Sequence, residues 1–125
     1  MAQQVPGFSN GICKANADLS THQFKFMKVS GDFTVDLNTT NAGNCLGVLQ
    51  DKPNAAGVPA NVMVDGVTKV KLGATLTAGA EVMSNASGVA VAATGVNAVV
   101  MGVLLEGGAS GEIVTMQLLR SAKAS

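Results

Sequence analysis

Apolar and polar residues alternate along much of this chain, and a period of two is typical of a half-buried β-strand. The pattern is clear in residues 24–27 and again in residues 33–37, and the turn formers Ser, Gly and Asp occupy residues 30–32 between them. This spacing predicts two strands joined by a tight turn.

Further short apolar stretches follow at residues 45–49, 62–64, 67–72 and 113–119. Turn-forming clusters punctuate the second half of the chain at intervals of roughly ten residues, the spacing of a small all-β domain. They stand at residues 77–79, 85–88, 94–97 and 106–111. Because no segment has a convincing helical period, we predict an all-β fold, a small β-barrel or β-sandwich of short antiparallel strands.

A weak internal echo links two of these stretches. Residues 46–50 read LGVLQ and residues 101–105 read MGVLL, so that Gly47 and Gly102 precede the same Val-Leu pair. Glycine inside a strand commonly marks a bulge or a close backbone crossing. The match predicts two related hairpins in one fold, although so short a repeat also arises by coincidence.

The organisation of the chain follows from these patterns. Residues 1–22 show neither period and are rich in Gln, Asn, Pro and Gly, so we expect an extended N-terminal arm. Residues 23–120 form the β-barrel or β-sandwich domain, and residues 121–125 a flexible C-terminal tail. The arm is either disordered, or it orders against a partner by laying its few apolar side chains into grooves.

Composition points toward assembly. The chain has 8 Lys and Arg residues against 8 Asp and Glu residues, and charged residues are only 13% of it while hydrophobic residues are 47%. Such a chain can hardly cover its surface with charge. Either Thr, Asn, Ser and Gly form its exposed faces, or other copies or another protein cover part of its apolar surface, and we favour the second.

Three classes of partner or location are disfavoured. A balanced charge, Arg120 as the single Arg, and the lack of Trp and Tyr argue against nucleic acid. Residues 82–105 carry no charge, but Ser, Asn, Thr and Gly interrupt them, so we expect strands and turns there and no membrane span. Residues 1–10 lack the basic start and apolar run of an export signal.

Candidate catalytic and zinc-binding chemistry is sparse. His22 is the only His and has Asp18 four residues before it, but no nucleophile, base and orienter can be assembled from the pattern, so an enzyme is not expected. Cys13 and Cys45 are too few for a zinc site. They are expected to be reduced, packed thiols, with a disulfide between them as the alternative.

The Asp, Thr and Asn residues around the first predicted turn are of the types that form an oxygen-rich calcium site. Asp32, Thr34 and Asp36 would share one strand face, with Asn38 and Asn41 nearby. The same residue types serve at any strand end or turn, so ordinary turn chemistry is the preferred interpretation. No metal and no cofactor is expected.

Several motifs, taken together, carry a family resemblance over residues 24–119. They are FMKVSGD (26–32), LGVLQ (46–50) with KP (52–53) and AG (56–57), GVTKV (66–70), GATLTAG (73–79) with Val82, residues 85–88, GVLL (102–105) and GE (111–112). Their order and spacing resemble the small capsid decoration, or cement, proteins of tailed bacteriophages.

The resemblance implies an all-β, non-enzymatic virion protein that is made in the host cytoplasm and sits on the capsid exterior. It implies a homotrimer at three-fold and quasi-three-fold positions that binds the major capsid protein and stabilises the head against internal DNA pressure. An alternative is an exposed head knob that binds a host receptor or glycan.

The arm matches no family pattern, so its role is inferred from its residues. We expect it to contact the capsid through Gln4, Val5, Pro6, Phe8 and Ile12. Deleting residues 2–12 should then weaken head binding while leaving the trimer folded.

Overall fold

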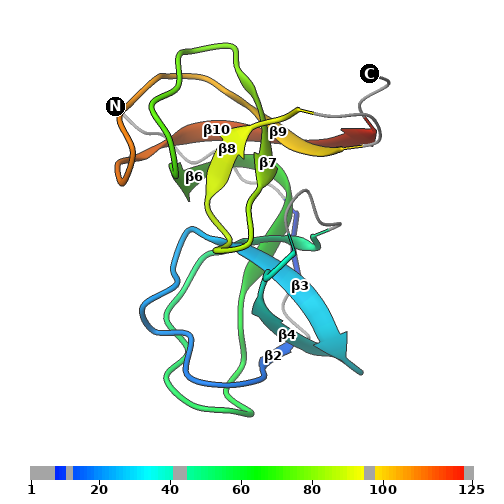
Figure 1. Cartoon of the computed structure of the whole chain (residues 1–125). Coiled ribbons are helices and arrows are strands. Elements are labelled where there is room, and N and C mark those ends of the chain that lie inside the picture. Colours follow the sequence, from blue (N-terminus) through cyan, green and yellow to red (C-terminus); the bar gives the residue numbers. More distant parts are fainter. Residues whose placement is uncertain (1–7, 11–12, 41–44, 95–97, 123–125) are drawn as a thin grey trace.

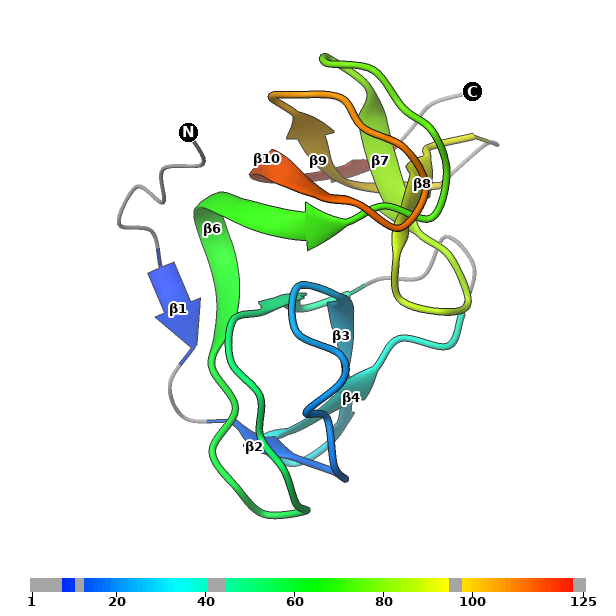
Figure 2. The same ribbon diagram turned by 90° about the vertical axis from the view of Figure 1, so that its left-hand side faces the viewer.

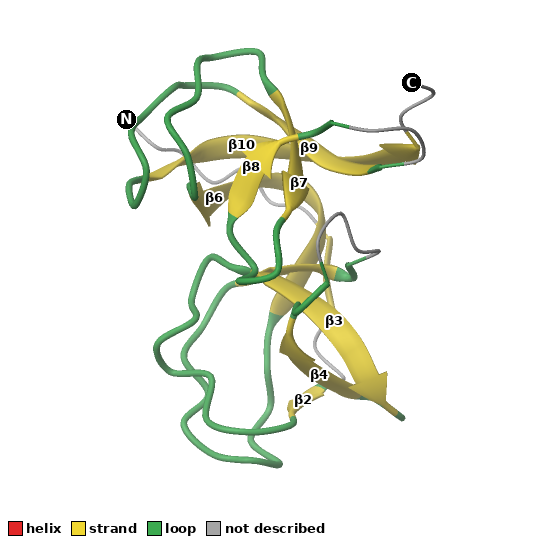
Figure 3. Ribbon diagram, in the orientation of Figure 1, coloured by secondary structure: helices red, strands yellow, loops and turns green. Residues whose placement is uncertain are grey.

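The computed structural model describes residues 8–10, 13–40, 45–94 and 98–122. These residues form β-strands and turns and no helix, so the predicted all-β class is confirmed (Figures 1 and 3). The strands are β1 (Phe8–Asn10), β2 (Lys14–Ala15), β3 (Phe26–Gly31), β4 (Thr34–Leu37), β5 (Gly47–Leu49), β6 (Val62–Lys71), β7 (Glu81–Ser84), β8 (Ala90–Ala92), β9 (Val99–Leu104) and β10 (Ile113–Ala122). Their hydrogen-bonded order is β2-β4-β3-β5-β6-β10-β9-β7-β8, and β1 also pairs with β6.

Strand β6 links two halves of the molecule. Its residues 62–65 pair with β1 and β5, and its residues 66–71 pair with β10. Figure 2 shows that β6 is sharply bent. Gly66, with φ 115°, is the first residue of the part that pairs with β10. The sequence predicts separate strands at 62–64 and 67–72. This is wrong, because glycine tolerates the left-handed φ that lets one strand bend and continue.

The two halves have the same topology. We call β1–β5 with residues 62–65 the first half, and residues 66–71 with β7–β10 the second half. We leave out the strands that open each half, which are β1 and β2 in the first half and residues 66–71 of β6 in the second. The remaining order is β4-β3-β5-β6 in the first half and β8-β7-β9-β10 in the second. The predicted pair of related hairpins is therefore confirmed, and it extends to each whole half.

The correspondence holds residue by residue. An offset of 55 takes the β3–β4 pair of Met27 and Leu37 to the β7–β8 pair of Val82 and Ala92. The same offset takes the hydrogen bond from the Phe24 N–H to the carbonyl of Leu49 to a bond from Gly79 to Leu104, and both measure 2.8 Å.

The interior positions also correspond. The same offset takes the buried residues Met27, Val35 and Leu49 to Val82, Ala90 and Leu104. Strand pairing adds two further matches, because Ala15 pairs with Val35 as Leu72 pairs with Ala90, and Val62 pairs with Leu49 as Met116 pairs with Leu104. All ten residues are at most 1% exposed. Each half thus buries one face of its strands, as the period-two pattern requires.

The two strand glycines lie where the backbones come closest. A Cβ added to Gly47 would overlap the carbonyl oxygen of Met63 in β6, and one added to Gly102 would lie 2.6 Å from the carbonyl oxygen of Gln117 in β10. The close crossing predicted from the sequence is therefore confirmed in both halves.

The largest apolar cluster joins the halves. Phe26, Cys45, Val48 and Met63 of the first half pack against the interior of the second half. A second cluster fills the first half, and a small third one, which contains Met83 and Val100, lies in the second half. Because one cluster spans both halves, neither half buries its apolar surface without the other.

Two phenylalanines lie outside the strands predicted for them. Phe24 and Phe33 were expected within strands, but β3 begins at Phe26 and β4 at Thr34. Both phenylalanines have left-handed backbone angles, with φ of 65° at Phe24 and 51° at Phe33. The prediction was wrong because a left-handed turn places an apolar residue at strand-like spacing without extending the strand.

Candidate interaction surfaces

His22 lies among cations. Its Nδ1 is 3.1 Å from the Nζ of Lys25. Partial burial lowers the pKa of His22, and the nearby charge of Lys25 lowers it further. Burial also lowers the pKa of Lys25, followed by the charge of Lys71. A His whose proton is disfavoured and whose ring nitrogen faces an ammonium group is poorly placed to activate a nucleophile.

Carboxylates next to turns accept hydrogen bonds from backbone N–H groups. Glu106 accepts hydrogen bonds from the Thr115 hydroxyl (2.8 Å) and backbone N–H (3.0 Å), and these bonds lower the pKa of Glu106. Glu112 accepts a 2.6 Å bond from the N–H of Ala109. Their role is to fix the turns between strands.

The residues considered for calcium are used locally. Asp36 accepts bonds from the side chain of Asn16 (3.0 Å) and from the N–H of Leu37 (2.8 Å). Asn38 is 2% exposed and donates to Ser84. Asn41 lies outside the described residues. Within the described ranges, no group of three or more His, Cys, Asp or Glu residues is arranged to hold a metal ion.

Cys13 and Cys45 are both buried, are not joined in a disulfide, and belong to different apolar clusters. The expectation of reduced, packed thiols is confirmed. The described part of the chain also has no helix that is long and apolar enough to cross a membrane.

The residues expected to bind the capsid fall mostly outside the described part of the chain. Gln4, Val5, Pro6 and Ile12 are not among the described residues. Phe8 opens strand β1, whose backbone pairs antiparallel with β6 opposite Asp65. The structure thus fixes where the N-terminal segment meets the body of the protein, and that position is at β6, between the two halves.

The base of the N-terminal segment is tied to the first half. Strand β2 pairs parallel with β4, and Ala15 exchanges backbone hydrogen bonds with Gly57 and Val58. Leu19 is 2% exposed and donates its N–H to the carbonyl of Pro53. At the other end of the chain, β10 extends to Ala122.

Large apolar side chains are exposed in three places. Leu105 directly follows β9, Ile113 and Leu119 lie on β10, and each of the three is about half exposed. Val64 of β6 is 38% exposed. Val29 and Phe33 lie at the tip of the β3–β4 hairpin, where they are 59% and 65% exposed. A partner that covers these side chains would remove exposed apolar surface from water, so they are the candidate interaction surfaces.

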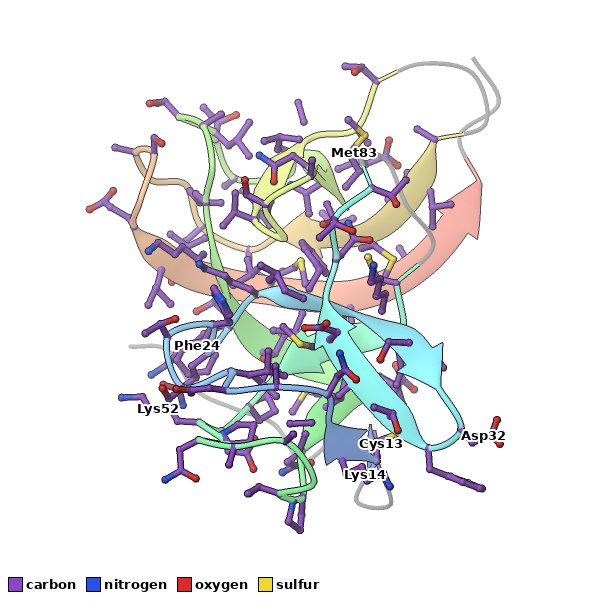
Figure 4. All side chains as sticks on the ribbon, turned by 60° about the horizontal axis from the view of Figure 1, so that its bottom comes forward. Cys13, Lys14, Phe24, Asp32, Lys52 and Met83 are labelled. Atoms are coloured by element: carbon purple, nitrogen blue, oxygen red, sulfur yellow. The ribbon has the colours of Figure 1, made fainter. Side chains whose placement is uncertain are left out.

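A basic group surrounds Phe24. The Nζ of Lys69 lies 5.8 Å from the centre of the Phe24 ring, which is a cation–π distance. Lys71 donates its N–H to the carbonyl of Phe24, and Lys25 follows directly in the chain. Figure 4 places Phe24 and Asp32, the neighbour of Phe33, on opposite sides of the first half. The two left-handed phenylalanines therefore belong to different surfaces.

The exposed hairpin tip was not predicted from the sequence, because Phe33 alternates with Val35 and Leu37 as a strand residue would. A signal was available: the residues 55 positions later are Gly88 and Ser84, neither of which is a large apolar residue. The glycine at position 88 indicates that the equivalent position 33 lies in a turn and not within a strand.

The geometry defines a small all-β protein in which the polar side chains serve turns and the apolar surface is only partly covered. The phage cement protein family matches residues 12–118, so the chain belongs to that family. The family is that of a structural component of the phage virion, in agreement with the interpretation that the protein is not an enzyme.

One similar solved structure is the head fiber gp8.5 N base of bacteriophage phi29, with 18% sequence identity and a TM-score of 0.67. The similarity covers 94% of this chain and 98% of that one, and it shows that the two share a fold. No curated protein sequence matches this chain.

Proposed function

We propose that this protein is a cement protein that binds the outer surface of the assembled capsid as a homotrimer, at three-fold and quasi-three-fold positions. Its task there is to stabilise the head against the outward pressure of packaged DNA. The observation that carries the proposal is the family match over residues 12–118, which is nearly the whole described body.

The physical basis is linkage. A protein that binds an assembled lattice and not its separate subunits stabilises the lattice in proportion to its affinity and concentration. Three copies held together reach several coat subunits at once, so modest single contacts add up to firm attachment. A body with 13% charged residues and exposed apolar side chains suits close packing among neighbours.

The proposed capsid contact is the N-terminal segment with Gln4, Val5, Pro6, Phe8 and Ile12, and its partner is the major capsid protein. Strand β1 supports this assignment because it anchors the segment along β6. Extended segments bind partners by adding a strand or by placing single side chains in grooves.

Heads that lack the protein provide the test. Purified protein is added, and co-sedimentation with assembled heads is compared with binding to unassembled coat protein. We expect the protein to bind assembled heads and not unassembled coat protein. Heads that carry the protein should release their DNA at a higher temperature than heads that lack it. Binding with altered host attachment and no gain in heat resistance would identify a receptor-binding knob instead.

The segment is tested by deleting residues 2–7, because Phe8–Asn10 form β1 and their loss would disturb β6. We expect weaker head binding from a protein whose fold and mass in solution are unchanged. A variant in which residues 2–7 become a Gly-Ser sequence of equal length controls for chain length. Full occupancy of heads by both variants would contradict the assignment.

A further inference from the structure

The hairpin of the second half is docked on the first half. Figure 1 shows β7–β8 reaching down to the start of β3. At its tip, Gly88 accepts a 2.7 Å hydrogen bond from the N–H of Phe26. The buried side chain of Asn38 donates to the Ser84 hydroxyl (2.8 Å) and to the Asn85 carbonyl (3.2 Å).

Shape is also matched at this contact. A Cβ on Gly88 would overlap the end of the Leu37 side chain and lie 3.2 Å from the carbonyl oxygen of Phe26. A larger residue at position 88 would therefore displace the end of the Leu37 side chain, and the φ of 75° at this position also favours glycine. The large residue of the contact is on the receiving half and the small residue is on the tip.

The first half has an equivalent tip whose backbone is held by β2, because the carbonyl of Phe33 accepts a 2.8 Å hydrogen bond from the N–H of Lys14, but whose apolar side chains are exposed. The 55-residue offset takes Gly88 to Phe33 and Ser84 to Val29, at the end of the β3–β4 hairpin. Ser84 is fully buried, whereas Val29 is 59% exposed. In Figure 1 this hairpin extends toward the lower end of the molecule, away from the second half.

The second half has the equivalent receiving position, which is also uncovered. The same offset takes Leu37 to Ala92, an exposed residue that pairs with Val82 as Leu37 pairs with Met27. The large and the small side chain therefore change places between the two pairs of positions. Within the chain, a glycine at the tip faces a leucine, whereas the uncovered tip has a phenylalanine and the uncovered receiving position has an alanine.

The backbone at Phe33 gives a second reason to expect a partner. Its φ of 51° is in the left-handed region, which costs a residue with a side chain on the order of 1–2 kcal/mol and costs Gly88 little. The Phe33 ring is 65% exposed, so within one chain little burial offsets that cost. Strain that is kept at an exposed side chain points to a role in binding.

We infer that copies of this protein associate head to tail, with the Phe33 tip of one copy docked beside Ala92 of the next. The proposed contact pairs the same two positions that meet within the chain, the hairpin tip and the residue opposite it. It does not repeat the hydrogen bonds of that contact, because the offset takes Asn38 to the buried Ala93 and the Phe33 carbonyl already accepts the N–H of Lys14. It joins different surfaces of the two copies, and such an interface closes into a ring when the rotation between copies allows it.

The inference rests on the proposed homotrimer, for which it supplies the contact. A coat protein is the other conceivable partner of the tip. A second copy is favoured because the complementary surface is present on this chain, with the matching change of residue size at both positions.

Three variants test the contact, with mass in solution measured by sedimentation. Phe33→Gly supplies the residue that the second half uses, so the fold is retained while the anchor is lost. Ala92→Leu fills the receiving position as Leu37 does. We expect each to raise the dissociation constant of the oligomer on the order of 30-fold or more, the effect of an interface hot spot.

The double variant Phe33→Gly with Ala92→Leu recreates the glycine and leucine pair found within the chain, so we expect it to regain association. Ala56→Leu, at an exposed turn of the first half, is the matched control and should not change the mass. Circular dichroism establishes that every variant is folded.

The outcomes separate this inference from the proposed function. An unchanged oligomer in both single variants would overturn the inference, as would a wild-type protein that is monomeric at all concentrations. Loss of head binding by Phe33→Gly with an intact oligomer would assign the tip to the coat protein and also overturn it. Head binding and heat resistance of the wild-type protein test the proposed function separately.

Discussion

The two halves of this protein share a topology and differ in how they fill the same two backbone positions. Positions 24 and 33 of the first half and positions 79 and 88 of the second all have left-handed φ angles. The second half uses glycine at both, which is the residue that this conformation favours. The first half uses phenylalanine at both, so in each case an aromatic side chain is retained at a cost in backbone strain.

The comparison also shows what each phenylalanine provides. Phe24 packs against the cluster that joins the halves and lies under Lys69, so its ring contributes to the fold. Phe33 is exposed at a hairpin tip. The same departure from glycine thus serves stability at one position and, as we infer, association at the other.

The largest expected effect comes from the strand glycines. Gly47→Ala would force a methyl group onto the carbonyl oxygen of Met63, and backbone cannot yield as a side chain does. We expect a loss of about 3 kcal/mol or more in the free energy of unfolding, measured in urea.

Gly102→Ala is the matched change in the second half and should also be strongly destabilising, because its Cβ would lie 2.6 Å from the Gln117 carbonyl oxygen. Since β6 and the largest cluster are shared, each variant should unfold in one transition. Two separate transitions would show that the halves are independent.

The next effect concerns the contact between the halves. Asn38→Ala removes the donor to the Ser84 hydroxyl and the Asn85 carbonyl, and it leaves buried polar groups without that partner. We expect a loss of about 2 kcal/mol in the free energy of unfolding. Asn54→Ala, at an exposed position, is the control and should change it by less than about 0.5 kcal/mol. Equal effects would mean that Asn38 does not join the halves.

The two phenylalanines should respond differently to glycine. In Phe24→Gly the lost burial and cation–π contact outweigh the relief of strain, so we expect a destabilisation of about 1 kcal/mol. In Phe33→Gly the relief of strain and the greater freedom of the unfolded chain nearly cancel, so stability should change by less than about 1 kcal/mol. Thermal unfolding of dilute protein measures both, and the reverse order would refute the comparison.

The smallest effect is a pH dependence from His22. Its pKa in the folded protein lies below the ordinary value of 6.5, because burial and Lys25 disfavour the proton. The unfolded chain therefore binds more protons just below pH 6.5, and stability falls as the pH is lowered through that value.

His22→Gln should flatten this slope between about pH 8 and pH 5. The carboxylates with lowered pKa, Asp18 and Glu106, titrate in the unfolded chain near 3.8 and 4.5, below most of this window. A slope that persists in His22→Gln would contradict the assignment.

Much of the fold was predictable because it depends on local pattern. Alternation identified the strands around Phe26 and Val35, and the glycines at 47 and 102 marked both close crossings. The left-handed turns at Phe24 and Phe33 were not predictable in the same way. Phenylalanine is typical of strands, and the spacing of an apolar residue does not reveal the sign of its φ angle.

The candidate site was less predictable than the fold. The N-terminal residues were selected as isolated apolar groups in a polar segment, and they remain a proposal. The hairpin tip was overlooked because Phe33 alternates with Val35 and Leu37 like a buried strand residue. Its exposure depends on whether another half packs over it, and this is a property of the assembled chain.

What the sequence alone determined is the period-two pattern, the shared glycines and the family, since pleated strands impose their spacing on neighbouring residues. Only the tertiary structure decided that β6 is one bent strand, that the tip at Ser84 is covered and that the tip at Val29 is free. The physical reason is distance along the chain: Ser84 is covered by Asn38, 46 residues away, and no local pattern records that contact.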